Sequence, residues 1–180
     1  MNSKSPFGKK KKCEHFIWDN LDNIKEARKE LCEEMPVFIY RLMQYTMMDV
    51  LRKAHGIEMA NKHFRAAGHL AGTEFAQNGL FLSADFNTFI SNLKRILRDL
   101  KIGILRMEDY DPDSGKIILT IAQDLDFSGA HINSKKVCVY DEGVIAGILE
   151  TYTGKKYEVR KEDCQTSGER ICRFVGAVIA

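Results

Sequence analysis

The sequence predicts an α+β fold, in which N-terminal helices pack on an antiparallel sheet of about four strands made from two hairpins, with one helix between the hairpins. Apolar residues recur at three- and four-residue steps over roughly the first hundred residues, which indicates amphipathic helices. After Gly103, paired apolar runs around turn residues appear twice, which is typical of hairpins. With 180 residues, 44% of them hydrophobic and 29% charged, the chain can bury one globular core.

Three of the five expected helices come before residue 78. The first covers residues 14–34 and is amphipathic, with its apolar residues on one face. The second starts after Pro36, is apolar almost all round, and ends at Gly56, which we expect to be a left-handed cap. The third, at residues 57–77, contains the small-residue sequence AAGHLAG. This sequence leaves room for the close approach of another backbone or of a ligand.

A fourth helix is expected after Ser83 and Asp85, either of which can cap its N-terminus. Beyond it, the predicted elements are strands at residues 103–110 and 116–122, a helix at 137–153 that Gly154 ends, and strands at 156–160 and 170–179. Residues 124–136 are expected to form a loop.

We interpret residues 1–13 as a flexible basic tail, because they hold five lysines and no acidic residue. Residues 14–180 then form a single domain. The run from Lys9 to Lys12 has the charge to contact nucleic acid or anionic lipid, but nucleic-acid binding is not expected from an isolated run. No long apolar stretch and no apolar segment after the basic start are present, so we expect no membrane span, no secretory signal and a cytoplasmic location.

Three cysteines in the C-terminal half suggest a metal site. Cys164 and Cys172 flank a predicted hairpin turn that can bring their thiols across from each other. Cys138 starts the preceding helix, where the helix N-terminus favours a thiolate. Zinc binds such thiolates, typically with four ligands. The alternative interpretation is that the three cysteines are small buried hydrophobic residues.

A fourth zinc ligand must come from nearby. The candidates are Glu162, Asp163, Glu142, His131 or a water molecule. Glu162 is the preferred one, because residues two apart in a strand face the same side. Glu162 is therefore expected to point with Cys164, while Lys161 points away.

The segment VCVYDEGVIAGILETYTGKKYEVRKEDCQTSGERICRFVGAVI resembles the 4-vinyl reductase domain, a small-molecule-binding module also found in transcription activators that sense aromatic compounds. The resemblance rests on Cys138, Tyr140, Glu142, Gly143, Gly147, Cys164, Gly168, Cys172 and Phe174. The sequences EMPVFIYRLMQ and AAGHLAG resemble the helical half of the same family, so the likeness extends over most of residues 30–178.

This resemblance implies a single ligand-binding domain whose fold is shared with vesicle-tethering complex subunits. It also implies a homodimer formed through the N-terminal helices, and a hydrophobic pocket between helices and sheet. In the sensor members, three cysteines and a glutamate hold a zinc ion. The cysteines carry over to Cys138, Cys164 and Cys172, but Lys161 stands where the family has the glutamate. Glu162 then substitutes, or a water does, or the site is empty.

The first functional hypothesis is a sensor-like domain that binds a hydrophobic or aromatic small molecule, a tetrapyrrole among the candidates. Met43, Met47, His69 and Phe89 are the predicted pocket residues, since Met and Phe form an adaptable apolar wall and His can orient a ligand. The same residues would also suit an ordinary core.

Two other functions stay open. One is an enzyme or accessory factor in tetrapyrrole vinyl reduction, as the family name implies, although neither GxGxxG nor a P-loop is present. The other is a scaffold subunit of a protein complex, by analogy of fold. The sequence shows no ATPase motif and no helix-turn-helix, so we expect a sensor to report through a partner.

Overall fold

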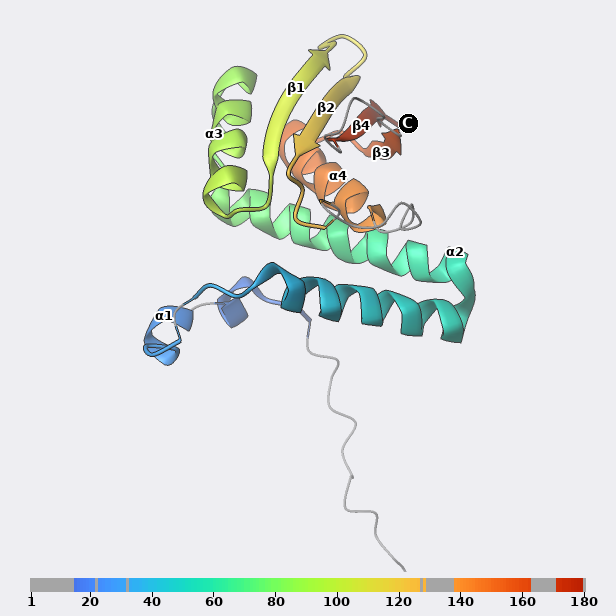
Figure 1. Ribbon diagram of the computed structural model, residues 1–180. Coiled ribbons are helices and arrows are strands. Elements are labelled where there is room, and N and C mark those ends of the chain that lie inside the picture. Colours follow the sequence, from blue (N-terminus) through green and yellow to red (C-terminus); the bar gives the residue numbers. More distant parts are fainter. Residues whose placement is uncertain are drawn as a thin grey trace, which may run out of the picture. The chain divides into compact units, whose positions relative to one another are not determined.

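The computed structural model describes residues 15–21, 23–31, 33–126, 128, 138–162 and 171–179. The chain forms two compact units, Met1–Glu34 and Met35–Ala180. The expected basic tail at 1–13, most of the expected loop at 124–136, and Cys164 lie outside the described residues. Within the second unit, helices and a four-stranded antiparallel sheet confirm the α+β class (Figure 1).

The first unit lacks the long helix expected at residues 14–34. Its described part has a short 3-10 helix, η1 (Trp18–Leu21), and one helical turn, α1 (Ile24–Ala27), neither of which has a buried residue. Asn23 between them is left-handed, with φ 60°. Asp and Asn favour turns because their side chains compete for backbone hydrogen bonds, and no packing in these two pieces offsets that preference. The prediction of one continuous helix is wrong here.

Helix α2 (Val37–Gly79) consists of two helical halves that meet at Gly56. Gly56 has φ 79° and ψ 167°, an extended conformation at positive φ that glycine adopts at little cost. The two predicted helices are therefore confirmed, but the residue that ends the first is not in the left-handed helical region. Figure 1 shows the halves side by side and antiparallel, and Met48, Ala60 and Phe64 pack together between them.

Helix α3 (Phe86–Asp99) begins at Asp85, whose side chain accepts hydrogen bonds from the backbone N–H groups of Asn87 and Thr88. The sheet contains β1 (Ile104–Tyr110), β2 (Ile117–Ala122), β3 (Tyr157–Glu162) and β4 (Ile171–Val178) in the order β1-β2-β4-β3, all antiparallel. Helix α4 (Val139–Thr153) separates the two hairpins and ends at the left-handed Gly154. The main core lies between α3, α4 and the inner face of this sheet.

The second half of α2 packs directly against α4 through glycines on both helices. A Cβ atom at Gly68 or Gly72 would lie 2.1 Å from a carbonyl oxygen of α4, and one at Gly143 or Gly147 would lie 2.2 or 2.3 Å from a carbonyl oxygen of α2. The AAGHLAG sequence is thus a helix-packing surface. The sequence left open whether another backbone or a ligand approaches this surface, and the structure shows that the backbone of α4 does.

None of the helices within the described ranges combines the length and the hydropathy that crossing a bilayer requires.

Candidate functional site

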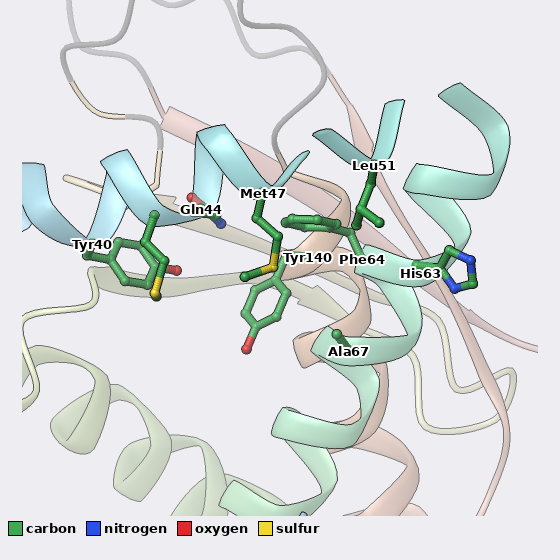
Figure 2. A pocket seen from close by; sticks show the side chains of 9 residues that line it. Tyr40, Gln44, Met47, Leu51, His63, Phe64, Ala67 and Tyr140 are labelled. Carbon is green, nitrogen blue, oxygen red and sulfur yellow. The ribbon is translucent and has the colours of Figure 1, made fainter. Parts of the chain in front are cut away.

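A pocket of about 320 Å³ opens between the two halves of α2 and the start of α4. Figure 2 shows side chains from all three segments around it. Its lining residues are Tyr40, Met43, Gln44, Met47, Leu51, His63, Phe64, Ala67 and Tyr140. In the first half, Tyr40, the adjacent pair Met43 and Gln44, Met47 and Leu51 follow one another at three- or four-residue steps, so they form one face of that helix.

The walls of the pocket are mostly apolar and partly open to solvent. Met43 and Met47, two of the residues predicted to contact a ligand, line it and are 55% and 52% exposed. Phe64 is buried on the opposite side, in the second half of α2. Methionine side chains are unbranched and polarizable, so such a wall can adapt to ligands of different shape.

Among the described residues of the lining, Gln44 is the one buried polar side chain. It is 7% exposed, and its Nε2 donates a hydrogen bond to Asp126 Oδ2 at 2.8 Å. Its Oε1 is shielded from solvent and has no hydrogen-bond partner within the described part of the chain. An apolar cavity with a small number of convergent polar groups is the usual form of a small-molecule site.

Asp126 is the centre of a buried polar cluster behind Gln44. Its carboxyl also forms hydrogen bonds with Tyr40 and Asp141, and its backbone N–H donates to Asp124 Oδ1 at 2.9 Å. Burial raises the pKa of Asp141 well above its usual range, and the nearby charges of Asp126 and Asp124 raise it further. Burial and Asp126 likewise raise the pKa of Tyr40. The protonated form of Asp141 is therefore favoured and can donate to Asp126.

Polar contacts also attach the first half of α2 to the chain that follows β2. The Tyr45 hydroxyl donates to the Asp126 carbonyl oxygen at 2.6 Å, and Arg41 Nε donates to the Leu125 carbonyl oxygen at 2.7 Å. These two contacts satisfy backbone carbonyls of the turn, and the Gln44 bond adds a contact to the Asp126 carboxylate. They hold one wall of the pocket in place.

The other two predicted ligand residues lie elsewhere. His69 is on the second half of α2, where its Nε2 lies 2.9 Å from Glu150 Oε2 on α4. Phe89 on α3 is fully buried in the main core and stacks on Tyr152, with ring centroids 3.9 Å apart. Neither residue lines the pocket between the halves of α2, so their role in ligand binding stays a prediction.

Cys138, Cys172 and Lys161 form a second polar cluster beside α4. Cys138, at the start of α4, and Cys172, in β4, are both buried. A hydrogen bond between them, together with burial, raises the pKa of Cys138, and the same bond lowers the pKa of Cys172. Lys161 Nζ donates to Cys138 Sγ at 2.9 Å. Burial lowers the pKa of Lys161, but its contacts with the two sulfurs outweigh this effect and raise it.

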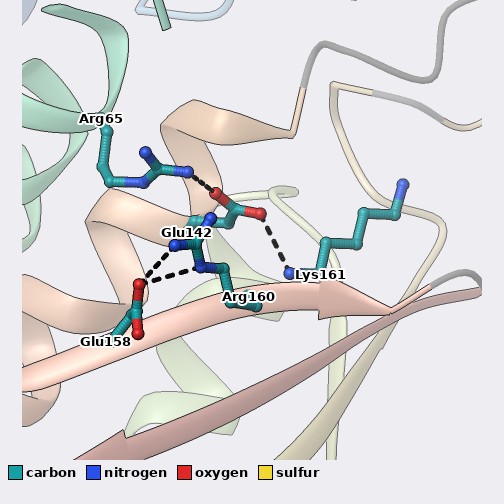
Figure 3. Close-up of polar contacts among 5 residues, drawn as sticks. All are labelled: Arg65, Glu142, Glu158, Arg160 and Lys161. Atoms are coloured by element: carbon teal, nitrogen blue, oxygen red, sulfur yellow. Dashed lines mark hydrogen bonds and ion pairs between the residues drawn. The ribbon is translucent and has the colours of Figure 1, made fainter. Parts of the chain in front are cut away.

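Glu142 sets the position of Lys161 in the fold. Its carboxylate accepts a hydrogen bond from the Lys161 backbone N–H at 3.0 Å and pairs with the Arg65 guanidinium (Figure 3). One carboxylate thus joins α4 to β3 and to α2. The side chain of Lys161 extends away from Glu142 in this view, which leaves its ammonium for the cysteines.

The prediction that Lys161 points away from the cysteines is wrong, and the predicted pairing of Glu162 with Cys164 involves a residue outside the described ranges. Lys161 turns toward Cys138, whereas Glu162 is exposed and pairs with Arg173, its partner in the sheet register. The reason is the alternation of the strand: buried Tyr157 and Val159 place every second residue on the inner face, and that face includes position 161.

These residues do not fit the zinc set that the resemblance implies. Cys138 and Cys172 come together, but an ammonium stands beside them, Glu162 points away, and Cys164 is outside the described residues. In the described ranges, no three His, Cys, Asp or Glu side chains are grouped so that they could hold a metal ion. A zinc ion stays a prediction from the sequence.

Residues 117–177 match the family model of the 4-vinyl reductase domain. This match covers about a third of the chain. The matched segment includes β2, α4, β3 and most of β4, and hence Tyr140 and the cluster of Cys138, Cys172 and Lys161. The family recognised from the sequence is thereby confirmed. Helix α2, which supplies most of the pocket, lies before the matched segment.

Three solved structures are similar to this chain in fold. A trafficking protein particle complex subunit 3 from Naegleria fowleri, covalently bound to palmitic acid, has a TM-score of 0.61 at 12% identity and covers 80% of this chain and 95% of its own. The phenol-responsive sensory domain of the transcription activator PoxR, with phenol, has a TM-score of 0.57 at 15% identity, with coverages of 80% and 76%. A vinyl-4-reductase family protein from Methanocaldococcus jannaschii has a TM-score of 0.55 at 17% identity, with coverages of 87% and 89%.

Sequence reasoning missed the polar part of the pocket. Gln44 occurs in the apolar run VFIYRLMQYTMM. It is a polar residue on the same helix face as Met43 and Met47, which could have indicated a polar group in the pocket. No sequence pattern pointed to Asp126. It is 82 residues from Gln44 in the sequence, and only the folded chain brings the two together.

Proposed function

We propose that this 4-vinyl reductase domain protein is a sensor-like domain that binds a hydrophobic or aromatic small molecule in the pocket between the two halves of α2. The observation that carries the proposal is the pocket itself: about 320 Å³, with an adaptable methionine wall and one buried polar side chain. Its volume lies within the range of small-molecule sites, about 300–1,000 Å³.

The comparisons support this proposal only through the shared fold. The PoxR domain is described with phenol and the trafficking subunit with palmitic acid, so the architecture has accommodated apolar molecules in two other proteins. Because sequence identity is 12–15%, their contacts do not transfer to this chain.

The test uses the fluorescent apolar probe N-phenyl-1-naphthylamine and a matched pair of variants. Ala67 and the neighbouring Ala66 are both exposed, but only Ala67 lines the pocket. Ala67→Phe fills the pocket and should weaken probe binding by at least about tenfold, while Ala66→Phe should leave binding within about twofold. A wild-type protein that does not bind the probe, or two variants that bind it equally, would contradict the proposal.

The proposed partner is a second copy of the chain, which receives the signal through the first half of α2. Beside the pocket, that half also exposes four further apolar side chains: Val37, Phe38, Leu42 and Val50. Phe38 alone is 66% exposed. Several exposed apolar residues on one segment indicate an interaction surface, and a homodimer through the N-terminal helices is what the family resemblance implies.

A further inference from the structure

We propose that the molecule bound in this pocket is an apolar cation, whose positive charge is a group without N–H donors, such as a quaternary ammonium, on an aliphatic or aromatic body. This inference rests on the proposed function, since it names the class of ligand that the pocket takes. Three features carry it: aromatic walls, polar groups that are already engaged, and buried negative charge one side chain away from the cavity.

The first feature is the aromatic share of the walls. Tyr40, Phe64 and Tyr140 line the pocket from three segments, the first half of α2, its second half and the start of α4 (Figure 2). Proteins recognise quaternary ammonium groups with several aromatic rings around one cavity, because the negative face of each ring attracts the cation. The thioethers of Met43 and Met47 are polarizable and add an uncharged wall.

The second feature is that the lining offers few hydrogen-bonding groups to a ligand. The Gln44 amide donates to Asp126 Oδ2 at 2.8 Å, and the Tyr40 hydroxyl is hydrogen-bonded to the same carboxylate. Gln44 Oε1 is shielded from solvent, so a ligand in the pocket does not reach it. The other polar groups of the lining are the Tyr140 hydroxyl and the exposed His63 ring. A primary ammonium or a carboxylate would lose hydrogen bonds to water here, whereas a quaternary ammonium has no N–H group to satisfy.

The third feature is the negative charge behind the lining. Asp126 and Asp124 are 2% and 3% exposed, and Asp126 contacts two of the lining residues, Tyr40 and Gln44. Buried charges are screened much less than charges at the surface, so the field of these carboxylates extends into the cavity. Arg41 donates to backbone carbonyls of the same turn, and the lining itself includes neither lysine nor arginine. The pocket therefore attracts a cation and repels an anion.

The experiment measures how well three molecules of one shape displace N-phenyl-1-naphthylamine: the cation trimethylphenylammonium, its neutral isostere tert-butylbenzene, and the anion benzenesulfonate. We expect wild-type protein to bind the cation about tenfold more tightly than the neutral isostere, and to bind the anion most weakly. Because tert-butylbenzene is the most hydrophobic of the three, hydrophobic burial alone predicts that it would bind best.

A pair of variants tests where this preference comes from. Asp126→Asn keeps an oxygen that can accept from Gln44 but removes the charge, so it should reduce the tenfold preference to about twofold. Asp49→Asn removes an exposed carboxylate on the same half of α2, which pairs with Lys53 and does not line the pocket. It is the matched control and should keep the preference.

The outcomes separate this inference from the proposed function. If the probe does not bind wild-type protein, the proposed function fails. If the probe binds but tert-butylbenzene or benzenesulfonate competes at least as well as the cation, the binding function stands and this inference is overturned. An unchanged preference in Asp126→Asn would contradict the role of the buried charge. The wild-type order is decisive even if Asp126→Asn does not fold.

Discussion

The two halves of α2 lie in different environments, and the more apolar first half is the less buried one. The second half approaches α4 so closely that Gly68 and Gly72 leave no space for a side chain. The first half is attached by polar contacts, from Arg41, Gln44 and Tyr45 to the turn after β2, and much of its apolar surface is exposed. One half is thus a structural support, and the other is a surface available to a ligand and a partner. Apolar composition alone does not distinguish a core helix from a binding helix.

The largest effect is expected at the glycine contact of the second half. Gly72→Ala places a Cβ 2.1 Å from the Val144 carbonyl oxygen, so the two helices must move apart. We expect a loss of about 3 kcal/mol in the free energy of unfolding, measured by urea denaturation. Gly79→Ala, whose Cβ meets only the Phe75 ring at 3.8 Å, is the matched control and should change little. Equal effects at both positions would show that the close contact does not determine stability.

An intermediate effect on stability is expected at Asp141, which is hydrogen-bonded to Asp126, the residue that Gln44 of the first half contacts. Asp141 has a raised pKa in the folded state, so the stability it contributes is complete below its unfolded value of 3.8 and is lost as the pH rises through the raised value. Asp141→Asn keeps a donor toward Asp126 and cannot ionise. We expect it to gain about 1–2 kcal/mol near neutral pH and almost nothing near pH 4, measured as Tm across that range. A gain that is independent of pH would contradict this account.

The next prediction concerns the polar cluster beside α4, the helix against which the second half packs. A substitution there should change stability less than one at Asp141, but it should change the metal content of the protein. The Lys161 ammonium stands next to Cys138 and Cys172. We expect wild-type protein to contain far less than one zinc per chain and Lys161→Glu, which restores a carboxylate ligand, to gain zinc, measured by elemental mass spectrometry. Lys161→Met should not gain zinc and serves as the control. One zinc per wild-type chain would show that the Lys161 ammonium does not prevent zinc binding.

The smallest change in stability is expected on the exposed face of the first half. Phe38→Lys with Leu42→Lys alters two exposed side chains, so the free energy of unfolding of the monomer should change by less than about 0.5 kcal/mol. The same variant should be a monomer where the wild type is a dimer, measured by light scattering after size exclusion. A wild-type monomer would exclude the proposed dimer and leave the face for a different chain.

The sequence predicted the fold because the fold depends on local patterns. Asp85 caps α3, Gly154 ends α4, and the break at Gly56 follows from a residue that tolerates positive φ. The prediction for residues 14–34 was wrong for the same local reason: periodicity indicated a helix, but Asn23 and its polar neighbours interrupt it where no packing supports it. Of the predicted site, Met43 and Met47 line the pocket, and Cys138 and Cys172 meet.

The sequence by itself therefore determined the class of fold, the family, and the small-residue surface of AAGHLAG. Only the tertiary structure decided what that surface contacts, which way Lys161 points, and that Gln44 is buried with an oxygen that no described residue pairs. Those outcomes depend on pairs of residues far apart in the chain: 82 positions between Gln44 and Asp126, and 23 between Cys138 and Lys161. Periodicity and capping act over one or two turns, so they carry no information about which distant groups share a buried environment.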